Sequence, residues 1–203
     1  MSGGISPATS SEISEEVAGI FFTRRNMIYF INTMRPREIT ASYLRNFIFG
    51  VEDGLVSTVG LLSGIAAVNV PRETIILTGM VLIFVEAFSM AMGSFLSESS
   101  AEEYEERTNG DSKNIFRRSF FDGLIMFFSY FAAGLIPLLP YIVTSGDAAL
   151  PISVGCSLSA LLLLGVLSGR ISRVSIARSA LRMTIIGGLA ISVGILVGSA
   201  IGR

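Results

Sequence analysis

The 203-residue sequence contains no histidine and a single cysteine, and only 15% of its residues are charged. Without histidine, imidazole can neither bind a metal ion nor carry a proton, so any proton transfer must use carboxylates. One cysteine, Cys156, excludes an intrachain disulfide and a cysteine-based metal cluster. There is also no Walker loop, dinucleotide-binding glycine pattern or HExxH helix. We therefore predict no enzyme, no catalytic residue, no cofactor and no nucleic-acid partner.

The sequence does contain long apolar segments. Hydrophobic residues make up 51% of the chain, and the mean hydropathy is +0.66, which is typical of membrane proteins. At roughly 20 residues per crossing, five segments can span a bilayer. We predict an all-α integral membrane protein whose five transmembrane helices cover residues 47–68, 74–97, 119–142, 150–169 and 183–202. Pro137 and Pro140 should kink the third span or end it irregularly.

The N-terminal region has a different character. Residues 1–16 are polar and acidic, which predicts a disordered tail and does not match the basic-then-apolar layout of a signal peptide. The apolar patches on either side of Arg24 and Arg25 are too short to span. We therefore predict an interfacial amphipathic helix and linker over residues 17–45, followed by the transmembrane domain over residues 46–203.

The basic residues predict the orientation. Thirteen of the fifteen lie before the first span or in the loops after the second and fourth spans, and the exceptions are Arg72 and Arg203. Basic loops stay in the cytoplasm. We predict a cytoplasmic N-terminus and an extracytoplasmic C-terminus, in a plasma membrane if the source is prokaryotic and in a vacuole-like membrane if it is eukaryotic.

Two adjacent acids, Glu52 and Asp53, lie in the first span, FIFGVEDGLVSTVGLLSG. A charge at the centre of a membrane helix costs about 3 kcal/mol on insertion scales, so a carboxylate there usually has a function. Neighbouring residues point about 100° apart on a helix, so only one of the two should be central to a site. The alternative is that both are solvated at headgroup level.

Glu86 in the second span has apolar residues on both sides, and Met90 follows four residues later on the same helix face. A carboxylate with a thioether suits Fe²⁺ or Mn²⁺ better than Mg²⁺ or Ca²⁺, which prefer oxygen ligands alone. The alternative for Met90 is ordinary gap filling in an apolar core.

Further acids follow the second span at helical spacing, which predicts that this helix continues into the cytoplasm with an acidic stripe. Such a stripe either collects cations at a pore mouth or is simply a solvated face. Its members are Glu98, Glu102, Glu103, Glu105 and Glu106. Asp122, at the start of the third span, either pairs with Arg117 and Arg118 or lines the pathway.

Small residues recur at four-residue spacing, which allows helices to approach closely. They are Gly50 and Gly54, Gly60 and Gly64, and Gly194, Gly198 and Gly202. For the first span this pattern indicates either ordinary helix packing or the seam of a dimer. Five helices make a thin bundle for enclosing a polar pathway, so we favour a homodimer.

Several stretches resemble the vacuolar iron transporter family: DGLVS at 53–57, SMAMGSFLS at 89–97, the segment at 100–105, GLIPLLPY at 134–141 and SALRMTIIGGLA at 179–190. The resemblance covers residues 42–203. It implies a five-helix protomer in a homodimer that exchanges cytoplasmic Fe²⁺ and Mn²⁺ for protons along its first two helices. The family's intramembrane aspartate and methionine fall on Asp53 and Met90.

The chain departs from the family in two places. Ser94 stands where the family commonly has glutamate, and Glu86 is our candidate replacement. The loop after the second span is too short for a full metal-binding insertion, so the chain resembles the short-loop, nodulin-like members. We expect a proton-coupled exporter of divalent transition metals; the alternatives are a passive cation channel and a non-transporting membrane scaffold.

Overall fold

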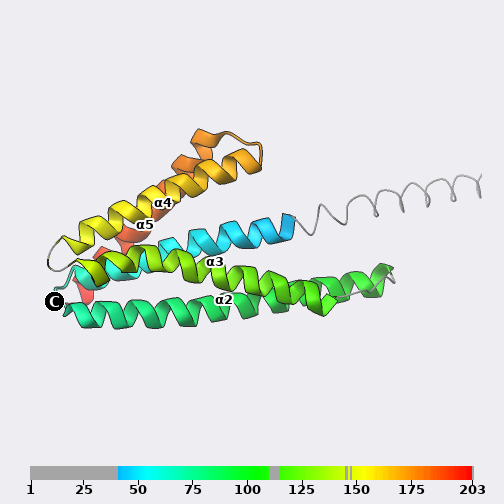
Figure 1. Cartoon of the computed structure of the whole chain (residues 1–203), viewed down its shortest axis with the longest axis horizontal. Coiled ribbons are helices and arrows are strands. Elements are labelled where there is room, and N and C mark those ends of the chain that lie inside the picture. Colours follow the sequence, from blue (N-terminus) through cyan, green and yellow to red (C-terminus); the bar gives the residue numbers. More distant parts are fainter. Residues whose placement is uncertain (1–40, 110–114, 145, 147, 203) are drawn as a thin grey trace, which may run out of the picture. The chain divides into compact units, whose positions relative to one another are not determined.

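Five long apolar helices account for nearly all of the part of the chain that the computed structural model describes, which is residues 41–109, 115–144, 146 and 148–202 (Figure 1). They are the first helix, Ala41–Ala66, followed by α2 (Arg72–Asn109), α3 (Ile115–Val143), α4 (Ala149–Ile171) and α5 (Ile176–Ile201). Each is long and apolar enough to cross a membrane, and these residues contain no strand. The predicted all-α class with five spans is confirmed. The predicted tail and interfacial helix lie outside the described residues.

The helix ends differ from the predicted spans where charged residues continue a helix. The first helix begins at Ala41 rather than at residue 47, and it ends at Ala66 before a turn in which Asn69 has a φ of 54°. α5 begins at Ile176 and so includes Arg178 and Arg182, which hydropathy alone assigned to the loop. Arginines continue a helix well, and their side chains reach out of the apolar layer. As predicted, α2 extends beyond its apolar part, to Asn109.

α3 continues as a helix through Pro137 and Pro140 to Val143. Of the two effects expected of these prolines, an end of the helix at this point is therefore wrong, and a kink stays a prediction. The last carbonyls of any helix lack intrahelical donors, and near this end of α3 some carbonyls accept hydrogen bonds from side chains of other helices. The Arg72 Nε donates to the Tyr141 carbonyl at 2.6 Å, and another Arg72 nitrogen donates to the Ile142 carbonyl. On the α4 side, the Ser153 hydroxyl donates to the Pro137 carbonyl at 2.6 Å.

The first helix packs against α3 along a seam with a constant register. Asn46 bonds to Asp122, and the next three contacts, one turn apart, keep the same separation of 76 residues along the chain. They are Gly50 with Met126, Gly54 with Tyr130, and Thr58 with Gly134. A constant separation means that the two helices run parallel. We call these four contacts the α3 seam.

Towards its C-terminal end the first helix turns from α3 to α5. A Cβ built on Gly64 would lie 2.5 Å from the carbonyl oxygen of Gly194, and one built on Gly194 or Gly198 would collide with the carbonyl of Gly60 or Gly64. These glycines therefore bring two backbones of the same chain into contact. Of the two interpretations offered for Gly60 and Gly64, the structure supports intramolecular packing.

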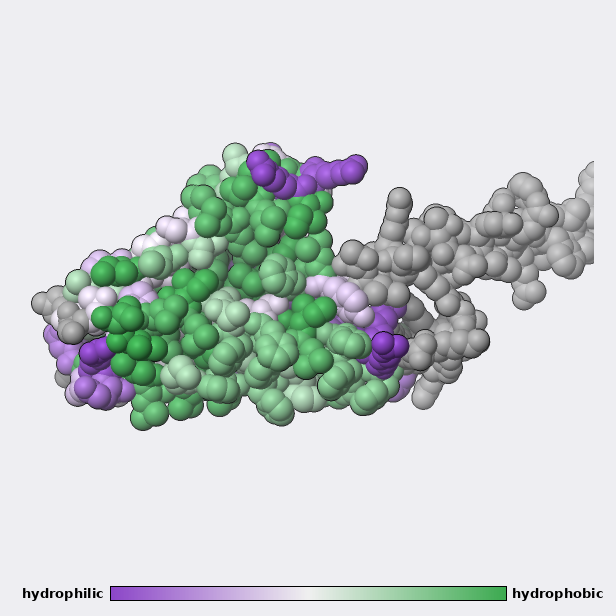
Figure 2. Space-filling view, viewed as in Figure 1, coloured by the Kyte–Doolittle hydropathy of each residue, from purple (hydrophilic) through white to green (hydrophobic). Residues whose placement is uncertain are grey.

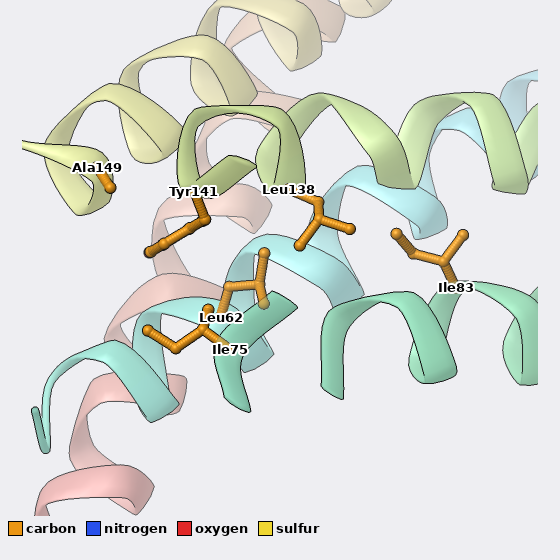
Figure 3. Packing of buried hydrophobic residues seen from close by; sticks show 6 residues of the cluster. All are labelled: Leu62, Ile75, Ile83, Leu138, Tyr141 and Ala149. Atoms are coloured by element: carbon orange, nitrogen blue, oxygen red, sulfur yellow. The ribbon is translucent and has the colours of Figure 1, made fainter. Parts of the chain in front are cut away.

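The buried apolar residues form two clusters. One cluster joins the first helix, α2, α3 and the start of α4 (Figure 3), and it consists of Leu62, Ile75, Ile83, Leu138, Tyr141 and Ala149. A second cluster joins the first helix, α3, α4 and α5, and it consists of Leu55, Ala133, Leu161, Leu164 and Met183. The first helix contributes to both clusters, so its placement depends on all four others.

Apolar side chains also cover the sides of the helices (Figure 2). On α2 the exposed apolar residues are Leu77, Val81, Phe84, Val85, Phe88, Met92 and Leu96, and on α5 they include Leu181, Ile185, Leu189, Val193 and Leu196. Surfaces this apolar suit lipid rather than water. Successive helices α2 to α5 alternate in direction, so the α2–α3 and α4–α5 connections share one end and the C-terminus lies at the other (Figure 1). Which of the two ends faces the cytoplasm stays a prediction.

Candidate functional site

Asp53 lies at the centre of the first helix, half-buried, one residue before the point where Gly54 meets the Tyr130 backbone. The Ser57 hydroxyl, one turn further on, donates a hydrogen bond to an Asp53 carboxylate oxygen at 3.3 Å. The carboxylate thus lies beside the α3 seam, is partly exposed, and accepts one weak local hydrogen bond.

Across the seam, the phenol of Tyr130 is a second polar group close enough to Asp53 to interact with it electrostatically. This side chain is fully buried, and its hydroxyl makes no hydrogen bond to any described residue. The hydroxyl lies beside Ser57 and within electrostatic range of two carboxylates, those of Asp53 and Glu86. A buried hydroxyl without a partner costs about 1–3 kcal/mol, so packing alone does not explain this one.

Glu86 and Met90 lie one turn apart on α2, and both are half-buried. They flank the inward stripe of Ile83 and Ala87, which is fully buried. Gly93, almost one further turn along, is exposed and has open space where a side chain would be. This flank of α2 therefore carries a carboxylate, a thioether and a gap. The Tyr130 hydroxyl connects Glu86 electrostatically with Asp53 on the neighbouring helix.

Glu52 points elsewhere, as the 100° step between neighbours predicts. The charge that acts on it most strongly is Arg182 of α5, and the Asp53 carboxylate is a weaker influence. The two acids of the first span thus face different helices, and Asp53 is the one beside α3 and Tyr130.

The predicted acidic stripe starts on the helical extension of α2. Glu98 pairs with Arg45 of the first helix at 3.6 Å, and Glu103 is exposed. The side chains of Glu102, Glu105 and Glu106 lie outside the described residues, so a cation-collecting role for the stripe stays a prediction.

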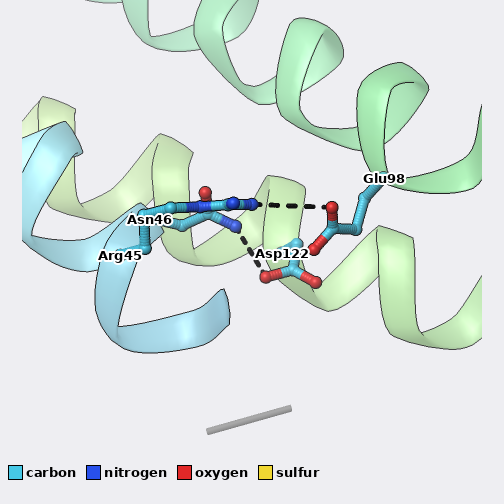
Figure 4. A network of polar contacts seen from close by, with 4 residues as sticks. All are labelled: Arg45, Asn46, Glu98 and Asp122. Atoms are coloured by element: carbon cyan, nitrogen blue, oxygen red, sulfur yellow. Dashed lines mark hydrogen bonds and ion pairs between the residues drawn. The ribbon is translucent and has the colours of Figure 1, made fainter. Parts of the chain in front are cut away.

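Asp122 is fully buried where α3 begins its apolar part, and its Oδ1 accepts a 2.6 Å hydrogen bond from the amide of Asn46 (Figure 4). Sequence reasoning considered only Arg117 and Arg118 as partners. The guanidinium of Arg117 lies 5.8 Å from the centre of the Phe121 ring. Asp122 thus links α3 to the first helix, two turns before Tyr130.

No group of three or more acidic, cysteine or histidine side chains is close enough to hold a metal ion among the described residues. What the structure does bring together is Asp53, Ser57 and Tyr130, with Glu86 near enough to act on the same phenol. Sequence reasoning missed Tyr130 because tyrosine in an apolar span is usually an ordinary core residue. The sequence contained one indication of its position: Tyr130 follows Asp122 by eight residues, which places both on one face of a helix.

The VIT family model matches residues 44–120 and 111–199. Vacuolar iron transporter homolog 4 of Arabidopsis thaliana is 31% identical over 160 residues, covering 75% of this chain and 81% of that protein. Vacuolar iron transporter homolog 1 of Oryza sativa subsp. japonica is 30% identical over 166 residues, covering 75% and 71%. Vacuolar iron transporter 1 of the same rice is 24% identical over 203 residues, covering 72% and 81%.

These matches follow the five apolar helices almost from end to end, so they describe the whole membrane part of the chain. The chain is an integral membrane protein. It belongs to the VIT family, as the resemblance in its sequence predicted.

Proposed function

We propose that this chain is a divalent transition-metal transporter that moves Fe²⁺ or Mn²⁺ out of the cytoplasm in exchange for protons. The observation that carries the proposal is that two half-buried carboxylates, Asp53 and Glu86, lie in the apolar parts of neighbouring helices, both within electrostatic range of the buried Tyr130 hydroxyl. Buried ionisable groups in a membrane domain mark ion paths and proton relays. The names of the relatives, vacuolar iron transporters, support the same assignment.

The chemistry of these groups fits a coupled exchange. A carboxylate binds either a proton or a divalent cation, so a path that contains two carboxylates can release protons as it takes up metal. The Met90 thioether adds a softer ligand, which favours Fe²⁺ and Mn²⁺ over Mg²⁺ and Ca²⁺. The Tyr130 hydroxyl can donate to either carboxylate or offer its oxygen to the ion.

Among the described residues no three acidic, cysteine or histidine side chains lie close enough to hold one ion, so carboxylates from a single chain do not complete a site. Asp53, Glu86 and Met90 are each half-exposed, so a second copy of the chain could reach them. Cyclic dimers are the commonest assemblies of identical chains. We propose a homodimer in which both protomers complete the pathway.

The distribution of charge supports entry of the ion from the cytoplasmic side. Basic residues flank the end of the bundle at which the α2–α3 and α4–α5 connections lie, and this end is the cytoplasmic one by the positive-inside rule. The acidic extension of α2 starts at the same end, where it can raise the local cation concentration before the ion reaches Asp53.

The test is Fe²⁺ and Mn²⁺ uptake into proteoliposomes with the cytoplasmic face outward, with and without an acidic interior. Wild type is compared with Asp53→Asn and Glu86→Gln, which keep the side-chain shape and remove the charge. Glu73→Gln is the matched control, because Glu73 is an exposed acid in the first turn of α2, far along the helix from Glu86.

We expect uptake that depends on the proton gradient, is lost in Asp53→Asn and Glu86→Gln and is retained in Glu73→Gln. If uptake by the wild-type protein does not depend on the proton gradient, the protein is a passive channel and not an exchanger. A folded wild-type protein that takes up neither metal would point to a membrane scaffold, and full activity in Asp53→Asn would remove Asp53 from the pathway.

A further inference from the structure

The bond between Asn46 and Asp122 joins two buried polar side chains inside an otherwise apolar contact. Asn46 is 5% exposed and Asp122 is 0% exposed, and the amide nitrogen lies 2.6 Å from the carboxylate oxygen (Figure 4). In the low dielectric of a membrane domain, separating such a pair leaves each group to find another partner. The contact therefore favours a single relative placement of the two helices.

This bond is also the first contact of the α3 seam. Of the three contacts that follow it, Gly50 and Gly54 place small surfaces on the α3 backbone, and Thr58 meets Gly134. Small surfaces allow close approach, but they resist sliding along the helix axis weakly, because one glycine resembles the next. A slip of one turn would move Asn46 from Asp122 to Met126 and separate the amide from the carboxylate. A single buried polar contact is a recognised way to fix helix register.

The register of this seam decides where Asp53 lies. Asp53 precedes Gly54, and Gly54 is the residue in contact with the Tyr130 backbone. Asp53 follows Asn46 by seven residues, and Tyr130 follows Asp122 by eight, so each functional residue lies two turns beyond its partner in the polar bond. Any shift or rotation at the Asn46 end is carried along the helix to Asp53.

We propose that Asn46 and Asp122 are positioning residues, whose hydrogen bond sets the register of the first helix on α3 and thereby holds Asp53 beside Tyr130. The proposal rests on the proposed function of Asp53. It assigns Asp122 a role other than ion binding: the carboxylate acts through Asn46 and makes no contact with the transported ion.

The neighbouring ion pair between Arg45 and Glu98 does not have this role. The Arg45 side chain is 68% exposed and the two groups are 3.6 Å apart, so the pair is screened and weak. It also joins the first helix to α2 rather than to α3. The buried contact between Asn46 and Asp122, one residue further along, joins the first helix to α3 and is shielded from solvent, so it can fix the register of the α3 seam.

The test compares the single variants Asn46→Ala and Asp122→Ala with the exchanged pair Asn46→Asp/Asp122→Asn, which restores an amide–carboxylate bond in the opposite sense. Fe²⁺ transport is measured as KM and maximal rate per folded protein, after each variant has passed size exclusion and thermal melting. Ser129→Ala is the matched control, since it removes a buried hydroxyl next to Gly50 and keeps the Cβ in that contact.

We expect both alanine variants to raise the KM for Fe²⁺ by about tenfold or more, the loss typical of a broken buried bond to a charged group. The exchanged pair should recover to within about threefold of wild type, and Ser129→Ala should match wild type. An exchanged pair as defective as Asp122→Ala would overturn the proposal, because it would show that the carboxylate is needed at position 122 itself. Wild-type KM in both alanine variants would overturn it as well.

A second experiment detects a change in the register of the first helix on α3 without measuring transport. In a Cys156→Ser background, Ser57→Cys places one thiol beside Asp53, and its rate of alkylation in membranes reports its exposure. Adding Asp122→Ala should change this rate several-fold, and the exchanged pair should restore it. An unchanged rate with Asp122→Ala would reject the positioning role even if the chain transports no metal; a changed rate in a chain without transport would reject only the proposed function.

Discussion

Gly54 lies directly on the backbone of Tyr130: a Cβ added at Gly54 would be 2.6 Å from the Tyr130 carbonyl oxygen. No flexible side chain stands between them, so neither helix can yield locally. The contact brings the first helix as close to α3 as two backbones can come, and it does so one residue after Asp53.

Gly54→Ala should therefore destabilise the protein, although alanine is the better helix former. We expect a loss of about 1–3 kcal/mol in the free energy of unfolding, because the methyl group meets backbone atoms that cannot move aside. Thermal melting in detergent measures the effect. Gly155→Ala on α4 is the control, since nothing lies within 4 Å of its added Cβ, and it should be neutral or slightly stabilising. Equal melting of the two variants would show that the close approach of Gly54 to Tyr130 does not limit stability.

The contact between the first helix and α5 makes a separate prediction. A Cβ at Gly194 would collide with the Gly60 carbonyl, whereas a Cβ at Gly188 has nothing within 4 Å. Gly194→Ala should lower the melting temperature, and Gly188→Ala on the same helix should leave it unchanged. Light scattering should find the same oligomeric state in both. A normal melting temperature together with dissociated subunits in Gly194→Ala would instead place this glycine at a dimer seam.

Arg72 is one of the two basic residues that fall outside the predicted cytoplasmic side, and the structure gives a local reason for it. Its guanidinium donates to the carbonyls of Tyr141 and Ile142 at the end of α3, where a helix leaves acceptors unpaired and its dipole favours a cation. Arg72→Ala should cost about 1–2 kcal/mol in the free energy of unfolding. Arg72→Lys should recover only part of this, because an ammonium group lacks the planar fork.

Thermal melting measures this effect too, with Glu73→Gln as the control. Glu73 is the exposed neighbour of Arg72 in the first turn of α2. A drop in melting temperature common to Arg72→Ala and Glu73→Gln would indicate a general effect of charge at this helix end rather than the two hydrogen bonds.

The five spans could be predicted from apolar length because a bilayer requires long runs without charge and satisfies backbone groups only within helices. The ends were less predictable, because hydropathy excludes a charged residue from an apolar span although arginine continues a helix well: α5 begins before Arg178. The glycine spacing identified surfaces of close approach, but not their partners. Which backbone Gly64 meets depends on how the helices are arranged, and a single helix face contains no information about that.

The acids of the candidate site were found because a carboxylate in an apolar span is costly and therefore conspicuous. Tyr130 and Asn46 are not conspicuous in this way, since a phenol or an amide is tolerated in many membrane helices. Their significance comes from contacts that are distant in sequence, such as the 76 residues between Asn46 and Asp122. That pairing becomes visible only once the register of the first helix on α3 is known.

The Tyr130→Phe variant tests whether the Tyr130 hydroxyl has a role in transport or only in packing. The ring stays in its fully buried position, and the variant removes only an oxygen that has no hydrogen-bond partner among the described residues. Stability should therefore be unchanged or slightly higher, because an unsatisfied buried group is lost.

If the hydroxyl serves the ion or proton path between Asp53 and Glu86, Fe²⁺ transport should fall by about tenfold or more in the same folded protein. Melting temperature and proteoliposome uptake are measured on one preparation. Tyr141→Phe is the control, because the buried Tyr141 hydroxyl also has no hydrogen-bond partner among the described residues, but Tyr141 belongs to the apolar cluster around Leu62. Equal transport by the two variants would leave Tyr130 a packing residue.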